Sequence, residues 1–295
     1  MFDNMLYLLI LIAFGYLVNQ NMDAERLKAG IKLFLIYLGI PGIVLYSLVS
    51  FDATVAEFTV ISIAVAISFF IYMLLSWIGN EIFSKEDKGI YVLLISFPNS
   101  GFLGLPICYV LFGESGLYFA SIYILICTLI HYTIGLFFSL QSEFKDIKFA
   151  IKGVGRFPIV YSMSIILVLF LLDLKLPSAV LGWLYYLGEL TTFLAVFFIG
   201  ASLELFGNDP VRSIAKESAY VGTFRFLISP AIMFLLCVYF GIKPDILVLE
   251  ASMPPAISNT VLAAHYSMNK GLSANITTVL TVIFIIAFSL ISLVI

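Results

Sequence analysis

Charged residues are scarce in this sequence. Only 11% of its 295 residues are Asp, Glu, Lys or Arg, whereas 62% are hydrophobic. That composition leaves too little polar surface to cover a water-soluble globule of this length. Together with a mean hydropathy of +1.12, it indicates a polytopic membrane protein. The formal net charge of −3 is small and spread along the chain, so the sequence predicts no nucleic-acid partner.

Cysteine and histidine are also sparse. The three cysteines, Cys108, Cys127 and Cys237, lie far apart inside apolar runs, and the two histidines are His131 and His265. This pattern contains no metal-binding or disulfide framework, so we expect no metal and no cofactor. The sequence lacks HExxH and GxSxG motifs, which disfavours an enzyme, and it lacks a GxxxxGK[ST] motif, which disfavours ATP-driven action.

Long apolar runs separated by short polar joints make up most of the chain. Each run is near the ~20 residues that a helix needs to cross a bilayer. The first run, MFDNMLYLLILIAFGYLV, has no basic residue ahead of it, unlike a cleaved signal peptide, and is interpreted as a membrane helix. We therefore expect an all-α polytopic protein with ten spans, at residues 4–19, 31–50, 58–78, 89–112, 117–139, 158–174, 180–204, 217–240, 245–266 and 272–293.

Basic residues are distributed unevenly between the joints. The joints after odd-numbered spans hold twelve of them, whereas the joints after even-numbered spans hold only Lys175 and Lys243. By the positive-inside rule, the odd-numbered joints are cytoplasmic and both chain ends are extracytoplasmic. We expect a multi-pass protein of the cell (inner) membrane whose longest joint, residues 140–157, is cytoplasmic. The twelve residues are Arg26, Lys28, Lys32, Lys85, Lys88, Lys145, Lys148, Lys152, Arg156, Arg212, Lys216 and Lys270.

The two halves of the chain are related in sequence. IYVLLISFP at 90–98 and ILVLEASMP at 246–254 share five of nine positions, among them a serine and a proline that common hydrophobicity does not explain. Each half holds five spans, an odd number, so equivalent spans cross in opposite senses, as in the inverted repeats of membrane carriers. We therefore expect a first repeat at 1–139, a linker at 140–157 and a second repeat at 158–295.

Spans four and nine are interrupted at equivalent positions. The first contains FPNSGFLGLP at 97–106, and the second contains MPPAISN at 253–259. Proline supplies no N–H to a helix, and each break lies about nine residues from a membrane face, which is near the midplane. We expect the two breaks to meet there and to expose unpaired backbone groups. Single proline kinks are common, but two accidental kinks would rarely both be followed by an asparagine, here Asn99 and Asn259.

Arg225, Glu250 and His131 are ionisable residues inside expected spans, where charge is costly and a functional role is the default interpretation. Arg225 in span eight pairs either with a carboxylate or with carbonyls at a broken helix. Glu250, just before the second break, is the expected partner of Arg225 and a candidate proton carrier. His131 in span five is a titratable candidate, although a lone histidine in a packed helix is more often simply hydrogen-bonded.

The motifs FPNSGFLGLP and ASMPPAISNTVLAAHY, with IPG at 40–42 and GASLE at 200–204, resemble those of the auxin efflux carrier family. This family includes the plant PIN-type carriers and prokaryotic permeases for organic acids, and the resemblance covers the whole chain. The long hydrophilic central loop of many plant members is missing, so the chain is similar to a prokaryotic member. It also has Pro255 where the plant carriers have a glutamine.

The resemblance implies a fold like that of sodium/proton antiporters and bile acid carriers. Spans one, two, six and seven would form a scaffold, and the others would form a moving transport domain. It also implies a homodimer through the scaffold helices and a substrate carboxylate held by the amide of Asn99, with Asn259 as a weaker partner. The residues implied at the site are Pro98, Asn99, Ser100, Gly101, Pro254, Pro255, Ser258 and Asn259.

The leading hypothesis is a secondary transporter in the lipid bilayer that carries small organic anions, such as carboxylates or auxin-like acids, by an elevator-type movement. Two alternatives stay open: a sodium-coupled carrier resembling the bile acid symporters, and a sensor built on a transporter fold. The coupling ion, proton or sodium, is open as well, and so is the part played in coupling by Arg225, Glu250 and His131.

Overall fold

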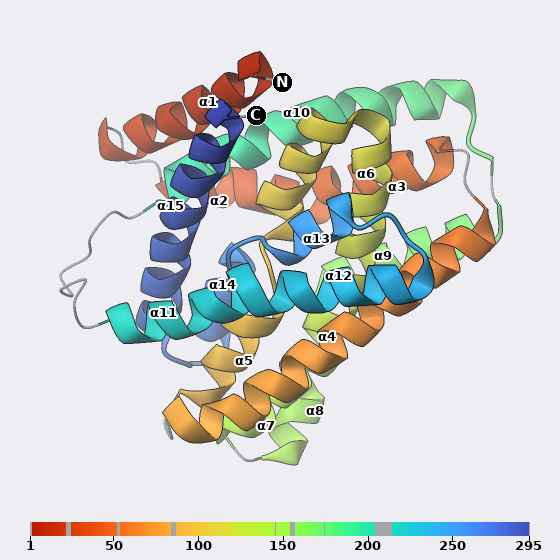
Figure 1. The fold of residues 1–295 in the computed structure, drawn as a ribbon. Helices are drawn as coiled ribbons and strands as arrows, with labels where there is room; N and C mark the ends of the chain where they lie inside the picture. The colour runs from red at the N-terminus through yellow and green to blue at the C-terminus, as the bar shows by residue number, and fades with distance from the viewer. Residues whose placement is uncertain are drawn as a thin grey trace.

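The computed structural model describes residues 2–21, 25–51, 54–83, 87–144, 146–153, 157–173, 175–203 and 214–294. These residues form helices joined by turns, together with an isolated β-bridge (Figure 1). The α-helices are α1 (Phe2–Asn21), α2 (Glu25–Phe34), α3 (Ile40–Ser50), α4 (Val55–Phe83), α5 (Lys88–Ser96), α6 (Leu105–Ile130), α7 (Leu136–Phe144), α8 (Ile147–Gly153), α9 (Pro158–Leu171), α10 (Ser178–Ser202), α11 (Ala215–Thr223), α12 (Ser229–Phe240), α13 (Asp245–Ala251), α14 (Ile257–His265) and α15 (Lys270–Val294). Short π-helical turns join several of them, namely η1 (Leu35–Gly39), η2 (Ser100–Gly104), η3 (His131–Gly135) and η5 (Phe224–Ile228).

Six helical stretches within the described residues are long and apolar enough to cross a membrane. Two shorter apolar helices, Leu6–Gln20 and Ile159–Leu171, accompany them. The protein is therefore an all-α membrane protein. Ten crossings stay a prediction, because the expected spans 89–112 and 245–266 are built from shorter helices on either side of a break. The six stretches are Glu25–Ser50, Val55–Gly79, Ser100–Phe144, Ser178–Ser202, Ala215–Phe240 and Lys270–Leu290.

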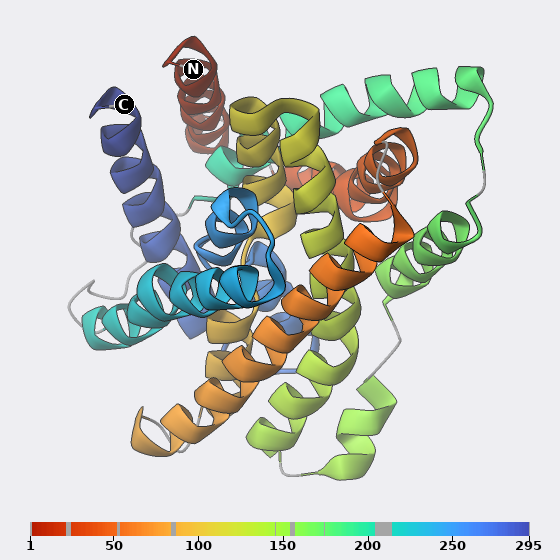
Figure 2. The ribbon, with the colours of Figure 1, turned by 45° about the vertical axis from the view of Figure 1, so that its right-hand side comes forward.

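The stretch Ser100–Phe144 is 45 residues long and reverses direction at Gly113. Gly113 has φ 63° and ψ −143°, a backbone conformation that glycine adopts without steric cost. The reversal brings Gly116 against the carbonyl of Cys108, whereas eight residues of straight helix would separate them by ~12 Å. The two limbs of α6 run side by side in Figures 1 and 2. One limb belongs to the expected span 89–112 and the other to the expected span 117–139.

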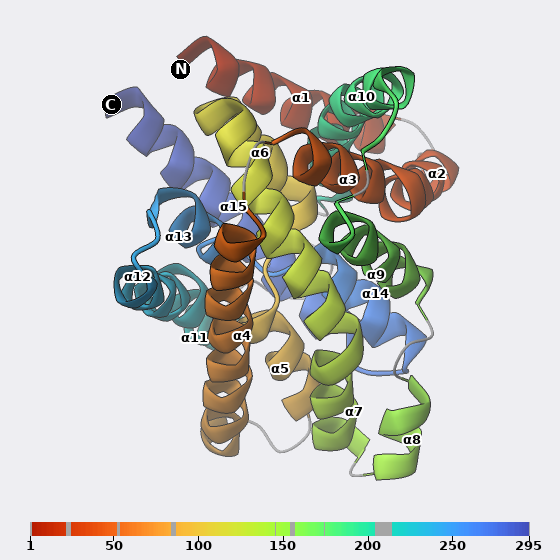
Figure 3. The same ribbon diagram turned by 90° about the vertical axis from the view of Figure 1, so that its right-hand side faces the viewer.

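Helices α1, α2, α3, α9 and α10 pack on one another and form one group, called the scaffold group below (Figure 3). Helices α1 and α10 approach closely because Gly15 faces the backbone of Phe197 and Gly200 faces the backbone of Ile12, with no room for a side chain at either glycine. Small residues allow such close helix packing in membranes. These helices are the ones to which the resemblance assigns the scaffold.

The other helices, α4 to α8 and α11 to α15, form a second group, called the crossing group below. Helix α5 lies at its centre, since every residue from Gly89 to Ser96 is buried. Contacts between the two groups run mainly between α3 and α6, between α6 and α9, and between η2 and α10. The break after α5 therefore lies at the junction of the two groups.

The start of α1 and the end of α15 lie at the same end of the molecule in all three views (Figures 1–3). That both ends share one side of the membrane, and which side it is, stays a prediction. Four of the basic residues behind that prediction, Lys85, Lys145, Arg156 and Arg212, lie outside the described residues, as does Glu204 of the GASLE motif.

Candidate functional site

The two proline breaks lie against each other at the centre of the molecule. Pro98 and Pro255 form an isolated antiparallel bridge. The backbone N–H of Asn99 donates to the Pro254 carbonyl at 2.7 Å, and the N–H of Ala256 donates to the Phe97 carbonyl at 3.0 Å. Because proline has no N–H, each extended segment can offer its neighbour only a short ladder of bonds. The crossing therefore joins α5 and η2 of one half to α13 and α14 of the other.

A cavity of about 60 Å³ lies beside this crossing. This is about the volume of two water molecules, so in this conformation it accepts a group the size of a carboxylate. Of the predicted site residues, Pro98, Asn99, Ser100, Gly101 and Ser258 line it. Pro254, Pro255 and Asn259 are absent from its lining and build the crossing instead. The other lining residues are Ile36, Ile40, Phe102, Ile124, Cys127, Thr128, His131, Tyr132, Ile159 and Ala256.

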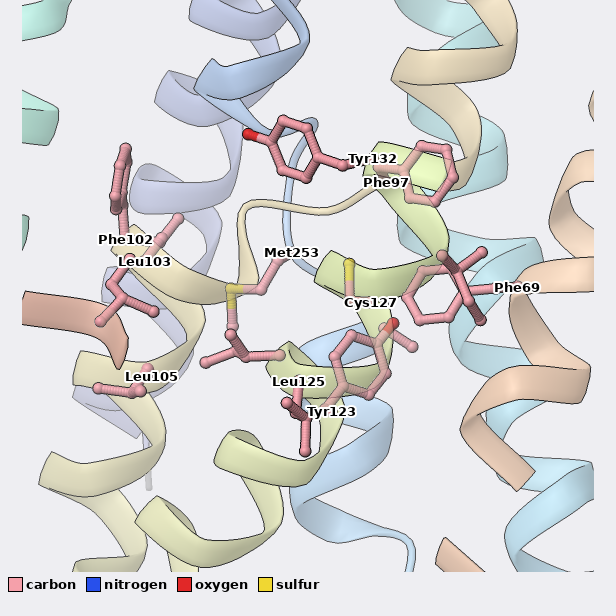
Figure 4. Close-up of a cluster of buried hydrophobic side chains, with 14 of the residues drawn as sticks. Phe69, Phe97, Phe102, Leu103, Leu105, Tyr123, Leu125, Cys127, Tyr132 and Met253 are labelled. Carbon is pink, nitrogen blue, oxygen red and sulfur yellow. The ribbon is translucent and has the colours of Figure 1, made fainter. Parts of the chain in front are cut away.

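The cavity lies between the two helix groups. Ile36, Ile40 and Ile159 belong to η1, α3 and α9 and form its scaffold side. The opposite side comes from η2, α6, η3 and the second break. Figure 4 shows the side chains of Phe97, Cys127 and Tyr132 around the unwound segments. Mostly apolar walls with a few converging polar groups are typical of binding sites for small molecules.

The two asparagines occupy different environments. Asn99 is 3% exposed, and its side-chain Nδ2 has no hydrogen-bond partner among the described residues. Asn259 is fully buried, and its Nδ2 donates to the carbonyls of Leu93 at 3.1 Å and Phe97 at 3.2 Å. These carbonyls lie at the C-terminal end of α5, and each also accepts one backbone N–H, that of Phe97 for Leu93 and that of Ala256 for Phe97. Asn259 thus bonds the end of a broken helix, whereas Asn99 lines the cavity and its Nδ2 has no partner among the described residues.

Arg225 is fully buried and joins both broken helices from behind the crossing. Its guanidinium donates to the carbonyl of Ile95 at 2.9 Å, at the end of α5. It also donates to the carbonyls of Ala251 at 2.7 Å and Met253 at 3.0 Å, at the end of α13, and weakly to Ser229 Oγ at 3.4 Å. A cation at two helix C-termini offsets the negative ends of both helix dipoles. Arg225 therefore has the second of the two roles considered from the sequence, a pairing with carbonyls.

The expected ion pair between Arg225 and Glu250 is absent from the described residues, which corrects the sequence prediction. The Glu250 carboxylate is fully buried and accepts a bond from Cys108 Sγ at 3.4 Å, while its Oε2 has no partner among the residues described. The physical reason is competition. Carbonyls freed at the breaks have no water to bond, so they take the guanidinium donors that the carboxylate would otherwise receive.

His131 begins η3 and lines the cavity. Its ring stacks on Phe97, with centroids 4.1 Å apart and an interplanar angle of 12°, and it neighbours Asn259. The histidine is 3% exposed. It therefore helps to pack the crossing as well as to form the cavity wall, in line with the reading of a packed histidine.

Sequence reasoning missed most of the apolar wall, including Ile36, Cys127, Tyr132 and Ile159. These residues come from spans that look uniformly apolar, so no periodicity marks the face that turns to the cavity. A second feature was also missed. The four π-helical turns within the described residues lie around the crossing: η1, η2 and η3 contribute to the cavity lining, and η5 carries Arg225. Such turns are frequent at functional sites.

Two interrupted helices that cross beside a cavity with a few converging polar groups, inside an all-helical membrane protein, are typical of membrane transport proteins. The chain belongs to the membrane transport protein family, which is the auxin efflux carrier family, because the model of that family matches residues 1–148 and 143–292. The resemblance inferred from the motifs is thereby confirmed.

Curated relatives agree with this assignment over nearly the whole chain. An uncharacterized transporter of Methanocaldococcus jannaschii is 29% identical over 287 residues, which are 92% of each chain. A second one, from Methanothermobacter thermautotrophicus, is 24% identical over 301 residues, or 99% of this chain and 97% of the relative. The uncharacterized transporter YfdV of Escherichia coli is 22% identical over 285 residues, or 90% and 88%. All three names describe transporters, which points away from an enzyme.

Proposed function

We propose that this protein is a secondary transporter for small organic anions, with its substrate site in the cavity beside the crossing. The observation that carries the proposal is Asn99, a lining residue of the cavity whose buried Nδ2 lacks a partner among the described residues. A buried donor without an acceptor is costly, and a carboxylate oxygen is the acceptor that suits it best. A substrate carboxylate would supply the missing partner.

The location of the cavity supports an elevator-type movement. Its walls come partly from the scaffold group and partly from the crossing group, so a displacement of one group against the other would carry the lining residues Asn99, Ser100 and Ser258 past the fixed Ile36 and Ile159. In this proposal the chain crosses the membrane ten times as two inverted five-helix repeats, 1–139 and 158–295, joined by the linker 140–157.

Uptake of a panel of labelled carboxylates and indole acids into proteoliposomes tests this function, with the corresponding neutral amides as controls. We expect an acid of the panel, but not its amide, to exchange across the membrane. Gly101→Leu is expected to abolish that exchange, because a Cβ at Gly101 already lies 3.0 Å from Ile40 Cδ1 and the larger side chain would fill the cavity. Gly182→Leu is the matched control, since a Cβ there meets nothing within 4 Å. Equal exchange of acids and amides, or wild-type exchange in Gly101→Leu, would contradict the proposal.

Membrane orientation has its own test, in a background without Cys108, Cys127 and Cys237. The predicted outer joints contain Lys175 and Lys243, and the predicted cytoplasmic linker contains Lys148; all three are exposed. We expect a membrane-impermeant maleimide to label Lys175→Cys and Lys243→Cys in intact cells, and Lys148→Cys only after permeabilisation. The opposite labelling pattern would invert the orientation.

A further inference from the structure

Glu250 is a buried acid that the proposed site does not use. It is 0% exposed and lies in the last turn of α13, beside the second break. Its Oε1 accepts only the weak thiol donor of Cys108, at 3.4 Å, and its Oε2 has no partner among the described residues. Gly104 packs directly on the carboxylate, because a Cβ at that position would overlap it. The acid therefore occupies a closed, tightly fitted pocket.

The surroundings of Glu250 favour its neutral form. An ionised carboxylate that is buried without a cation is very costly, and the negative end of the α13 dipole adds to that cost. The nearby positive charge of Arg225 is used by backbone carbonyls, including that of Ala251. The titratable and charged groups around Glu250 are Cys108, Tyr123 and Cys127 on α6 and Arg225 on η5, with Cys237 on the neighbouring α12.

One π-helical turn connects this acid to the cavity. Ser100 and Gly101, at the start of η2, line the cavity, and Gly104, at its end, contacts the Glu250 carboxylate. The Asn99 carbonyl accepts both the Leu103 N–H at 3.1 Å and the Gly104 N–H at 3.0 Å, so the turn is tied to the residue that carries the free amide. A ligand at Asn99 that shifts η2 therefore also changes the packing on Glu250.

We propose that Glu250 carries a proton in symport with the organic anion, and that η2 couples the two sites. An anion in the cavity and an ionised Glu250 would be two negative charges in one low-dielectric group of helices, so anion binding favours the protonated acid. By linkage, protonation of Glu250 favours anion binding to the same extent. The inference rests on the proposed function for its substrate.

The proton balance of the cycle is simple. On the side of higher proton activity, the Glu250 carboxylate takes one proton from water and the cavity takes one anion. On the other side, the anion leaves and the carboxylic acid returns its proton to water. A monoanion therefore moves with one proton and no net charge. With Glu250 ionised and the cavity empty, the crossing group returns without proton or anion.

The first test needs no substrate and compares the wild type with Glu250→Gln by thermal unfolding in detergent between pH 5 and 8. Unfolding exposes a neutral Glu250 to water, where it ionises above about pH 4.3 and releases one proton. The folding equilibrium constant should therefore fall by up to about tenfold per pH unit as the pH rises. In Glu250→Gln, this contribution of Glu250 to the pH dependence of the folding equilibrium constant should be absent. Asp245→Asn, an exposed acid on the same short helix, is the matched control and should keep the wild-type slope.

The second test uses proteoliposomes and the same panel of labelled acids. With an inward proton gradient, the wild type should accumulate an acid of the panel, and Glu250→Gln should accumulate at least tenfold less of it. At equal pH on both sides, Glu250→Gln should still exchange labelled acid across the membrane. The proton proposal would be overturned if the stability of the wild type and of Glu250→Gln depended equally on pH in the first test, or if Glu250→Gln accumulated the acid as fully as the wild type. A missing flux of every acid in the wild type, with the slope difference present, would instead reject the substrate class and leave Glu250 as a proton site.

Discussion

Arg225→Ala is expected to leave little folded protein in the membrane. The substitution removes the donors of three buried carbonyls, those of Ile95, Ala251 and Met253, from the ends of two half-helices at once. No water in the bilayer replaces those donors. Removal of one partner from a buried charged interaction typically costs about 3–5 kcal/mol, a large part of the stability of a domain. The yield in gel filtration and the melting temperature of the detergent-solubilised protein measure the effect.

Two further variants separate the geometry of Arg225 from its charge. Arg225→Lys keeps the charge but has a single amino nitrogen in place of the planar guanidinium, so its donors are expected to reach the carbonyls of only one helix end. The melting temperature of Arg225→Lys should therefore be clearly lower than that of the wild type. Arg26→Ala, on the exposed face of α2, is the matched control and should have no measurable effect. A melting temperature of Arg225→Lys equal to that of the wild type would show that charge alone holds the crossing.

The role of Arg225 marks a limit of sequence reasoning. The sequence correctly singled it out as a costly intramembrane charge, and it offered both a carboxylate and carbonyls as partners. The partners are backbone groups up to 130 residues away, and carbonyls carry no side-chain signature. Glu250 is the predicted partner of Arg225 because it is the acid nearest to a break in the sequence. Proximity along the chain, however, does not predict which acceptor bonds the guanidinium.

The breaks themselves could be predicted well. Prolines at 98, 254 and 255 cannot sit in a regular helix, and the related motifs in the two halves indicate that the breaks meet. The structure places them in one antiparallel bridge. The cavity wall could not be predicted, because residues such as Ile124 and Thr128 acquire their position only when α6 reverses at Gly113 and packs against α9.

The sequence pattern suggests that the two asparagines are equivalent, but the structure places them in different environments. Each follows a proline break, which suggests similar roles for Asn99 and Asn259. The inverted arrangement does not make their surroundings equal. The Asn259 amide donates to the carbonyl end of α5, whereas Asn99 precedes η2 and lines the cavity, and its Nδ2 has no partner among the described residues. The pair of substitutions at these positions should therefore have opposite signatures.

Asn99→Ala is expected to keep the melting temperature of the ligand-free protein within error, because its Nδ2 bonds no described residue. It should weaken the binding of the transported anion by about five- to 150-fold, the value of a hydrogen bond to a charged group at about 1–3 kcal/mol. Asn259→Ala should instead lower the ligand-free melting temperature, since it removes the second donor of the Leu93 and Phe97 carbonyls, at about 0.5–1.5 kcal/mol per hydrogen bond.

Paired measurements on both variants distinguish a ligand-binding amide from a structural one. Melting curves without ligand report the fold, and the ligand-induced shift reports the site. Thr192→Ala is a suitable control, because its hydroxyl bonds the Gly188 carbonyl within α10 and lies outside the cavity lining. If Asn99→Ala melts lower than the wild type without ligand and keeps the full ligand-induced shift, then its amide stabilises the break, and the anion must bind elsewhere. If Asn259→Ala loses the shift without losing stability, the two amides hold the anion together, because only a shared ligand would make two differently buried groups behave alike.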